Sequence, residues 1–380
     1  MNLEKFCQEE LDLRNKEHNL RFLRPIKENQ GLFLNENNQT FLNFSSNDYL
    51  GLRNNPSVIL EAKNFLEQFG TGSGASRLVS GNSQAFTLLE KKIASFKKTE
   101  DSLVFSSGYA CNVGVMQALT AKGDLIIGDK WNHASIIDGG RLADATFRTY
   151  PHLDLEYLRN FLKEKRKEYR SVLIVTDAVF SMDGDLADLE SLCNIKEEFD
   201  CWLMVDEAHS TGVIGKNGCG LVEALQLNKR VDVIMGTLSK ALGSQGGFIA
   251  GSKSLIEYCV NKARSFIYST GLNPAACGAA FKAIELIETE TKHLENLNKN
   301  KEYFESLTNL KSPSPIYPII LGTSANALAK AEEFRKAQIF VQAIRPPTVA
   351  EGSARLRITL TASHTKADLE KIAKLIKALK

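Results

Sequence analysis

The chain has 380 residues, of which 43% are hydrophobic and 24% charged, a composition typical of soluble globular proteins. Its formal net charge of +2 supplies no broad basic surface for nucleic acid, and no stretch approaches the roughly 20 apolar residues of a membrane span. The seven cysteines include no Cys-x-x-Cys pair, which argues against a zinc site or a disulfide framework. Because the N-terminus also lacks the apolar centre of a signal peptide, the sequence predicts a cytoplasmic protein with no metal site.

The N-terminal residues predict a helix followed by a hairpin. Apolar residues spaced among many charges favour an amphipathic helix within residues 2–20. Two apolar runs, 32–34 and 41–44, flank a turn-rich segment and predict a β-hairpin. An arm of residues 1–50 is too small to fold alone, so we expect it to pack against another domain or another subunit.

Apolar, β-prone runs alternate with helical segments from about residue 100 to residue 250, within a predicted large domain of residues 51–275. The predicted strands are 103–105, 125–129, 147–150, 172–176, 202–205 and 231–235. This alternation is typical of a largely parallel sheet covered by helices. Only six residues separate Lys240 from the next apolar run, Gly247–Gly251. That connection is too short for a parallel crossover, so we expect this strand to be antiparallel.

Residues 276–380 predict a smaller α/β domain. Long helices are expected within 274–309, where charged residues suggest an exposed face. The predicted elements that follow alternate between strands and helices: 319–321, 325–337, 339–341, 356–360 and 366–379.

Two neighbouring predicted strands end in side chains that can do chemistry. The strand 202–205 is followed by Asp206 and His209, and the strand 231–235 by Thr237, Ser239 and Lys240. In open α/β sheets, ligands bind at the carboxyl ends of the strands. A lysine amine can form a Schiff base with an aldehyde cofactor.

Pyridoxal phosphate (PLP) needs such a lysine and also a carboxylate against its pyridinium nitrogen. Asp206 could supply the carboxylate, and His209 could reach the phenolic oxygen of the ring. The hydroxyls of Thr237 and Ser239 could bind the phosphate. Taken alone, a lysine is usually a solvated surface residue and an aspartate after a strand is commonly a helix cap. The combination favours a cofactor site over those structural explanations.

Other loops at the predicted carboxyl edge add candidates. The turn from strand 103–105 into a helix presents the backbone of Gly108 and Tyr109, suited to a phosphate. His133 also follows a predicted strand, although a lone histidine there is more often a capping residue. The Gly/Ser loop 70–77 lacks the Lys-Ser/Thr of a nucleotide-binding loop, and a mobile linker and a part of the active-site wall remain equally open.

Several motifs in this sequence resemble the α-oxoamine synthases, PLP enzymes of fold type I, the aspartate aminotransferase-like architecture. They are LNFSSNDYLGL (42–52), GSGASRLVSG (72–81), SSGYACN (106–112), DAVFSMDGDLADL (177–189), VDEAHSTGVIG (205–215), GTLSKALGSQGG (236–247) and RPPTVAEGSARLRITLTASH (345–364). The resemblance runs nearly from end to end. It implies a large, mostly parallel, seven-stranded-type sheet domain, a small C-terminal α/β domain and a short N-terminal arm.

The resemblance also implies roles for single residues. Lys240 would carry the PLP Schiff base, Asp206 would bind the pyridinium nitrogen, His209 the phenolic oxygen, and His133 would stack on the ring. The remaining implied cofactor residues are Gly108, Tyr109, Ser181, Thr237 and Thr270, the last in a segment that relatives lend across a dimer interface. The implied substrate residues are Arg21, Asn47, Thr348 and Arg357. Ser239 departs from the glycine that is common before the lysine.

Within this family the closing motif most resembles the biotin-pathway branch. That branch implies a homodimer that condenses L-alanine with a pimeloyl thioester, with loss of carbon dioxide. The sequence does not distinguish coenzyme A from an acyl-carrier protein as the carrier of the acyl group. The alternatives are a glycine-using member such as 2-amino-3-ketobutyrate CoA ligase or 5-aminolevulinate synthase, an aminotransferase of the same fold, and a non-enzymatic regulator.

Overall fold

The computed structural model describes residues 2–29 and 31–379, which form two compact units. The small unit comprises Met1–Asn47, Met182–Gly184 and Asn296–Lys380. The large unit comprises Asp48–Ser181 and Asp185–Glu295. The N-terminal arm and the C-terminal residues therefore belong to one unit, whereas the sequence predicted separate segments 1–50 and 276–380.

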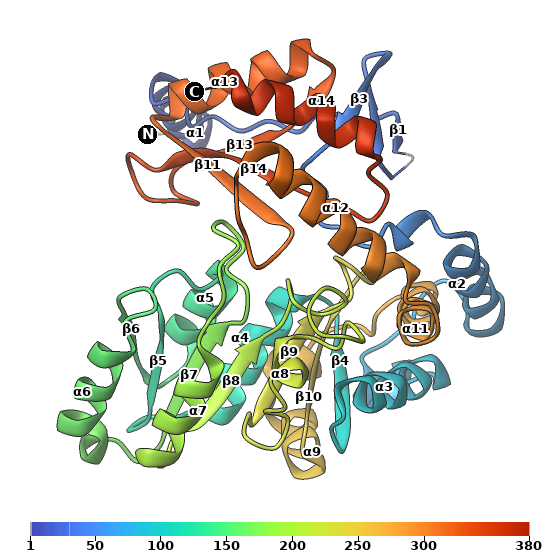
Figure 1. Ribbon diagram of the computed structural model, residues 1–380. Coiled ribbons are helices and arrows are strands. Elements are labelled where there is room, and N and C mark those ends of the chain that lie inside the picture. The colour runs from blue at the N-terminus through green and yellow to red at the C-terminus, as the bar shows by residue number, and fades with distance from the viewer. Residues whose placement is uncertain (1, 30, 380) are drawn as a thin grey trace. The chain divides into compact units, whose positions relative to one another are not determined.

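A seven-stranded mixed sheet forms the centre of the large unit (Figure 1). Its strands are β4 (Asp101–Phe105), β5 (Leu125–Asp129), β6 (Thr146–Tyr150), β7 (Val172–Asp177), β8 (Trp202–Asp206), β9 (Val233–Thr237) and β10 (Gly247–Gly251), in the order β4-β10-β9-β8-β7-β5-β6. The run from β9 to β6 is parallel. β10 is antiparallel to both β4 and β9, which confirms the prediction from its short connection. The predicted fold class is confirmed.

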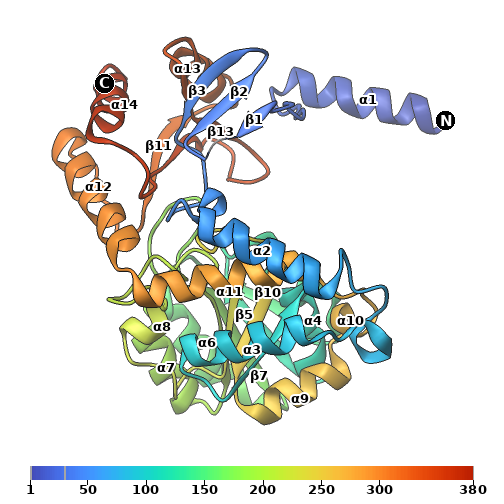
Figure 2. The same ribbon diagram turned by 90° about the vertical axis from the view of Figure 1, so that its right-hand side faces the viewer.

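Both faces of this sheet are buried, because helices pack on each. One face carries α4 (Gly108–Leu119), α5 (Ala134–Leu142), α9 (Lys253–Lys262) and α10 (Arg264–Ile267). Alternate strand residues such as Phe105, Val175 and Met235 pack against these helices. In Figure 2, α7 (Leu189–Glu198) and α8 (Leu221–Ala224) lie on the other side of the sheet. The outer helix α6 (Leu155–Lys165) contacts α7.

Three helices form a layer beside the edge strand β4. They are α2 (Pro56–Phe69), α3 (Gln84–Lys97) and α11 (Pro274–Thr289). α11 contacts both other helices, and Figure 2 shows the three side by side. These contacts attach α11 to the large unit, so the unit boundary falls after Glu295 rather than at the predicted 275/276.

The small unit contains two sheets. The first has the order β1-β2-β3-β12 and the second the order β11-β14-β13. Their strands are β1 (Glu28–Asn29), β2 (Phe33–Glu36), β3 (Gln39–Asn43), β11 (Ile316–Gly322), β12 (Ile339–Phe340), β13 (Gln342–Ile344) and β14 (Ala354–Thr359). The predicted hairpin is the antiparallel pair β2 and β3. β12 pairs in parallel with β3, so a C-terminal strand completes the arm's sheet.

The helices of the small unit are α1 (Leu3–Lys16), α13 (Ser324–Lys336), α14 (Lys366–Lys377) and all but the first four residues of α12 (Lys292–Thr308). α1 has no buried residue and extends away from the sheets of its unit (Figure 2). α14 begins with a capping box, in which Thr365 and Asp368 each accept a hydrogen bond from the other's backbone N–H. Within the described residues, no helix is both long and apolar enough to span a bilayer.

Candidate active site

The parallel strands β7 and β8 bring two aspartates together at the carboxyl edge of the sheet. Asp177 ends β7, Asp206 ends β8, and the two are register partners. Both carboxylates are buried. The sequence predicted Asp206 as a site residue but did not single out Asp177, although the same signal, an aspartate that ends an apolar strand, marks both.

Hydrogen bonds from two elements hold the Asp206 carboxylate. Oδ1 accepts from the backbone N–H of Ala208 at 2.9 Å, and Oδ2 accepts from Nδ2 of Asn112 at 2.8 Å. Asn112 lies on α4 and also donates to Oγ of Ser135 at 2.9 Å. Its Oδ1 is buried without a partner among the described residues. Asn112 was not predicted, although it lies one helical turn after Gly108, where helical periodicity could have indicated it.

His133 caps α5 next to this carboxylate pair. Its backbone N–H donates to Oδ2 of Asp177 at 2.7 Å, and its Nδ1 lies 2.7 Å from Oγ of Ser135. Burial lowers the pKa of His133 below its usual value, and the positive charge of Lys240 lowers it further, while Asp206 opposes the shift. The imidazole is therefore neutral near pH 7.

The Asp177 carboxyl has the opposite shift. Burial raises its pKa well above the usual range, and the negative charge of Asp206 raises it further. The N–H of His133 and the charge of Lys240 oppose this rise. Lys240 therefore acts on both Asp177 and His133, and the three residues share one electrostatic environment with Asp206. Such perturbed groups gather at functional sites.

Lys240 lies in the turn that follows β9. Its carbonyl accepts from the N–H of Gly243 at 2.9 Å. Gly243 has φ +61°, and a Cβ there would lie 2.6 Å from the backbone nitrogen of Arg53. The turn therefore needs glycine both for its conformation and for its close approach to residues 52–53.

The predicted phosphate hydroxyls are engaged with the backbone of the same loop. Oγ1 of Thr237 donates to the carbonyl of Gly246 at 2.9 Å and accepts from the N–H of Ser239 at 3.2 Å. Oγ of Ser239 donates to the same carbonyl at 3.3 Å. Each hydroxyl has a single proton, so either would have to turn away from Gly246 to donate to a phosphate. Both ends of β9 lie two residues later than predicted, and Thr237 is its last residue.

The N-terminus of α4 lies against this loop. A Cβ at Gly108 would lie 3.1 Å from Cε of Met235 and 3.6 Å from Cβ of Thr237. A Cβ at Gly247 would lie 2.6 Å from Cα of Gly108, so β10 leaves room for the helix to begin here. The first N–H groups of a helix have no acceptor within the helix, which suits an anion. Tyr109 could bind a phosphate only through its backbone N–H, because its half-exposed side chain donates a hydrogen bond to Asp138.

His209 is held by a residue that the sequence did not indicate. Its Nδ1 lies 2.7 Å from Oη of Tyr49, which is fully buried. His209 itself is 6% exposed. Tyr49 lies within the motif 42–52, but nothing in its spacing pointed to residue 209.

Two further predicted cofactor residues lie in other loops of the large unit. Ser181 lies in a hairpin in which the N–H of Phe180 donates to the carbonyl of Asp185 at 3.0 Å. Thr270 forms an isolated antiparallel bridge with Ser76 of the Gly/Ser loop. The cofactor roles of Ser181 and Thr270 stay predictions.

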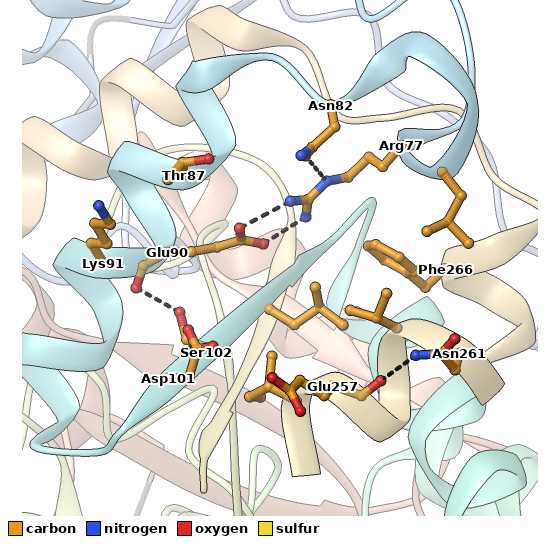
Figure 3. A pocket seen from close by; sticks show the side chains of 14 residues that line it. Arg77, Asn82, Thr87, Glu90, Lys91, Asp101, Ser102, Glu257, Asn261 and Phe266 are labelled. Atoms are coloured by element: carbon orange, nitrogen blue, oxygen red, sulfur yellow. Dashed lines mark hydrogen bonds and ion pairs between the residues drawn. The ribbon is translucent and has the colours of Figure 1, made fainter. Parts of the chain in front are cut away.

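Arg77 anchors the Gly/Ser loop, as Figure 3 shows. Its guanidinium forms a two-pronged ion pair with Glu90 of α3, at 2.6 Å and 2.9 Å, and Nε donates to Oδ1 of Asn82 at 2.9 Å. It also lies 4.3 Å from the ring centre of Phe86 and 5.2 Å from that of Phe266. A bidentate pair of this kind fixes geometry. The end of the loop is therefore anchored to α3, which disfavours the interpretation as a free linker.

The predicted substrate residues pair within the small unit. Nη2 of Arg21 donates to Oγ1 of Thr348 at 2.9 Å, and Nη1 of Arg357 donates to Oδ1 of Asn47 at 3.2 Å. Arg21 and Thr348 are 327 residues apart in the chain, and Asn47 and Arg357 are 310 apart. Each of the two predicted arginines therefore donates a hydrogen bond to a neutral side chain that was also predicted as a substrate residue.

Comparison with known proteins now defines the class. The model of the family described as "Aminotransferase class I and II" matches residues 39–376, so the chain belongs to this family. A solved structure described as SPT with PLP internal aldimine has a TM-score of 0.94 at 27% identity, covering 100% of this chain and 98% of that one. This likeness also confirms the PLP fold type I predicted from the motifs.

Closer relatives narrow the assignment. The chain is 45% identical over 345 residues to 8-amino-7-oxononanoate synthase of Treponema denticola, covering 89% of this chain and 87% of the relative. It is 41% identical over 371 residues to 8-amino-7-oxononanoate synthase 1 of Bacillus subtilis, with 96% and 94% covered. The solved 8-amino-7-oxononanoate synthase of Francisella tularensis has a TM-score of 0.77 at 29% identity, covering 89% of this chain and 97% of that one. Within the family, the chain belongs with the 8-amino-7-oxononanoate synthases.

Proposed function

We propose that this chain is a PLP-dependent 8-amino-7-oxononanoate synthase of biotin biosynthesis, which condenses L-alanine with a pimeloyl thioester. The observation that carries the proposal is the convergence of Asp206, His133 and Lys240 at the carboxyl edge of one sheet. The relatives that bear this name match 89% and 96% of the chain.

The donor set at this edge fits PLP. Asp206 offers a buried carboxylate for a protonated ring nitrogen, and the start of α4, beside Thr237, offers backbone N–H groups for a phosphate. The amine of Lys240 would hold the cofactor through its aldehyde group. When bound, the cofactor supplies an electron sink for the carbon that bears the amino group of the substrate.

Three residues of the large unit have different roles in proton transfer: Lys240, Asp206 and His133. Lys240, as a free amine, would remove the α-proton of alanine, a role typically worth about 10²–10⁴-fold in rate. Asp206 keeps the proton on the ring nitrogen, with Asn112 and the N–H of Ala208 fixing its orientation. His133, whose pKa burial lowers, would lie against the ring and exclude water from that face.

The condensation forms one carbon–carbon bond, between the α-carbon of alanine and the carbonyl carbon of the thioester. The carbon–sulfur bond breaks and the thiolate leaves with the electron pair and takes up a proton. Loss of the alanine carboxylate as carbon dioxide, with protonation of the same carbon, yields the amino ketone. Arg357, beside Asn47, binds the alanine carboxylate, and Arg21, beside Thr348, binds the far carboxyl of the acyl chain.

The proposed enzyme is a cytoplasmic homodimer. Thr270 and the exposed Tyr268 belong to the segment that would reach the partner subunit's cofactor. The acyl carrier is either coenzyme A or an acyl-carrier protein, and a direct comparison of the two pimeloyl thioesters as substrates distinguishes them.

The decisive experiment compares alanine and glycine, each with pimeloyl-CoA and with acetyl-CoA, by thiol release and product mass. We expect alanine with pimeloyl-CoA to be the preferred pair. A single methyl group is worth only about 1–3 kcal/mol in a pocket, so slow turnover of glycine is expected. A preference for glycine with acetyl-CoA would replace the assignment by a ketobutyrate ligase. Transamination without thiol release would replace it by an aminotransferase.

A further inference from the structure

A fully buried ion pair includes the residue that follows Asp206 in the chain. Nζ of Lys97, the last residue of α3, is 2.8 Å from Oε2 of Glu207, the first residue after β8, and each side chain is 1% exposed. The ammonium also donates to Oγ1 of Thr211 at 2.8 Å and to the carbonyl of Cys219. All three protons of the lysine therefore have acceptors.

The glutamate is held as completely as the lysine. Its Oε1 accepts from the N–H of Val222 at 2.9 Å and from Oγ of Ser210 at 3.1 Å. Its own N–H donates to the carbonyl of Met235 in β9 at 2.7 Å. A Cβ at Gly220 would lie only 2.4 Å from Oε2, so the surrounding loop closes tightly on the carboxylate.

This pair and the candidate site share one short segment. Asp206 hydrogen-bonds Asn112 of α4, whereas the adjacent Glu207 hydrogen-bonds Lys97 of α3, so neighbouring side chains turn to different helices. The carbonyl of Glu207 accepts from the N–H groups of Ser210 and Thr211 and closes the turn that carries His209. Any movement of Glu207 therefore displaces both Asp206 and His209.

Stability alone is a poor explanation for such a pair. Removing two charges from water is expensive, and apolar side chains of similar volume often serve as well or better in a core. A directional network of six hydrogen bonds around Lys97 and Glu207, by contrast, fixes a backbone segment in one position.

We propose that Lys97 and Glu207 are positioning residues, which hold the segment 206–211 so that Asp206 and His209 meet the cofactor. The inference rests on the proposed PLP function, because it concerns the residues that would contact the ring. Neither Lys97 nor Glu207 touches the cofactor. They act through Asp206 and His209 of the same segment.

A second lysine–carboxylate pair provides a matched control. At the opposite end of β8, Nζ of Lys196 is 2.6 Å from Oδ2 of Asp232, and the same oxygen accepts from the N–H of Leu203 at 2.7 Å. This pair ties down the same strand but lies away from Asp206. Lys196→Met should lower stability without changing the site.

The test measures the site spectroscopically, without turnover. Wild type, Lys97→Met, Lys196→Met and the double variant Lys97→Met/Glu207→Gln are titrated with PLP. Cofactor affinity is followed by the visible absorbance band, and the pH midpoint of that band is recorded. The double variant leaves no buried charge and keeps the size of residue 207, so it is designed to fold even where Lys97→Met does not.

We expect cofactor affinity to fall at least roughly tenfold in Lys97→Met and in the double variant, with a shifted pH midpoint of the band. Lys196→Met should match the wild type in both readouts, whatever its unfolding temperature. Wild-type affinity and pH midpoint in the double variant would overturn the inference and leave the pair a purely structural one. A wild-type protein that forms no visible band with PLP would instead refute the proposed function, and the inference with it.

Discussion

Two buried aspartates at opposite edges of the seven-stranded sheet have pKa values shifted in opposite directions. At the amino edge, Asp124 precedes β5 and accepts hydrogen bonds from Arg170 at 2.9 Å and 2.6 Å. Burial opposes ionisation of Asp124, but the hydrogen bonds from Arg170 and from backbone N–H groups hold its pKa below the usual value. At the carboxyl edge, burial raises the pKa of Asp177, and the negative charge of the neighbouring Asp206 raises it further.

Both aspartates are almost inaccessible, so burial opposes the charged form of each, and their partners decide the direction in which the pKa moves. A guanidinium stabilises the charged form of Asp124, whereas a second carboxylate destabilises that of Asp177. The amino edge thus contributes to stability. The carboxyl edge concentrates unfavourable charge that a bound cationic or protonated group would relieve, as expected at a functional site.

The largest effect should come from removing the lysine of the carboxyl edge. Lys240→Ala should reduce synthase activity by at least roughly 10³-fold, because the proposed mechanism uses Lys240 both for covalent attachment and as the base. PLP should still bind non-covalently, since the other contacts remain. Activity by thiol release and cofactor retention by gel filtration check this. The control Lys229→Ala changes an exposed lysine near the amino edge and should have no effect. More than trace activity in Lys240→Ala would contradict both assigned roles.

The next effect should follow from Asp206→Asn. Without the carboxylate, the ring nitrogen is no longer held protonated, so removal of the α-proton should slow by about 10²–10³-fold. Deuterium exchange at the α-carbon of alanine, measured without a thioester, isolates this step. Asp124→Asn makes the same change at the amino edge. It should lower the unfolding temperature and leave the rate of deuterium exchange at the α-carbon of alanine unchanged in the PLP-bound enzyme. Exchange at the wild-type rate in Asp206→Asn would reduce that residue to a structural cap.

A pH-dependent effect should arise at His152, at the carboxyl edge. Burial lowers its pKa, but hydrogen bonds to Asp129 at 2.9 Å and Asp185 at 2.8 Å outweigh burial and raise the pKa to about 9. The ring also stacks on Trp131, with centroids 3.9 Å apart.

The folded-state pKa of His152 is raised, so its stabilisation is fully present below about pH 6.5 and lost as the pH rises through about 9. Compared with wild type, His152→Gln should be less stable by about 1–3 kcal/mol at pH 6 and nearly equal at pH 10. Urea unfolding at both pH values measures this. A stability difference that does not change with pH would show that packing against Trp131, rather than charge, is what His152 contributes.

The smallest effect is expected from Arg170→Ala at the amino edge. The Arg170 side chain is 66% exposed, so its loss should shift the unfolding temperature by only a few degrees at pH 7 and leave activity unchanged. The folded-state pKa of Asp124 is lowered, so the contribution of this pair is present above about pH 3.8 and lost as the pH falls through the folded-state value. Thermal unfolding of variant and wild type should therefore converge in acid.

Local patterns in the sequence predicted most of the fold. Apolar β-prone runs placed the strands of the large sheet, and β5 and β10 have the predicted bounds. The length of one connection decided the direction of β10. The bounds of the strands were predicted less accurately: β9 is shifted by two residues from the predicted run, and β13 was not predicted. Strand ends depend on which backbone groups find partners in neighbouring strands, and local composition does not contain that information.

The sequence by itself determined which chemical groups follow the strands, because a side chain at a strand's end is placed by its own neighbours in the chain. Only the tertiary structure decided which groups meet. Asn112 reaches Asp206 across 94 residues, Lys97 reaches Glu207 across 110, and Tyr49 reaches His209 across 160. The order of strands in the sheet made Asp177 the neighbour of Asp206, and the pairing of β3 with β12 joined the two ends of the chain into one unit. These contacts depend on packing between distant segments, which no periodicity or spacing along the chain encodes.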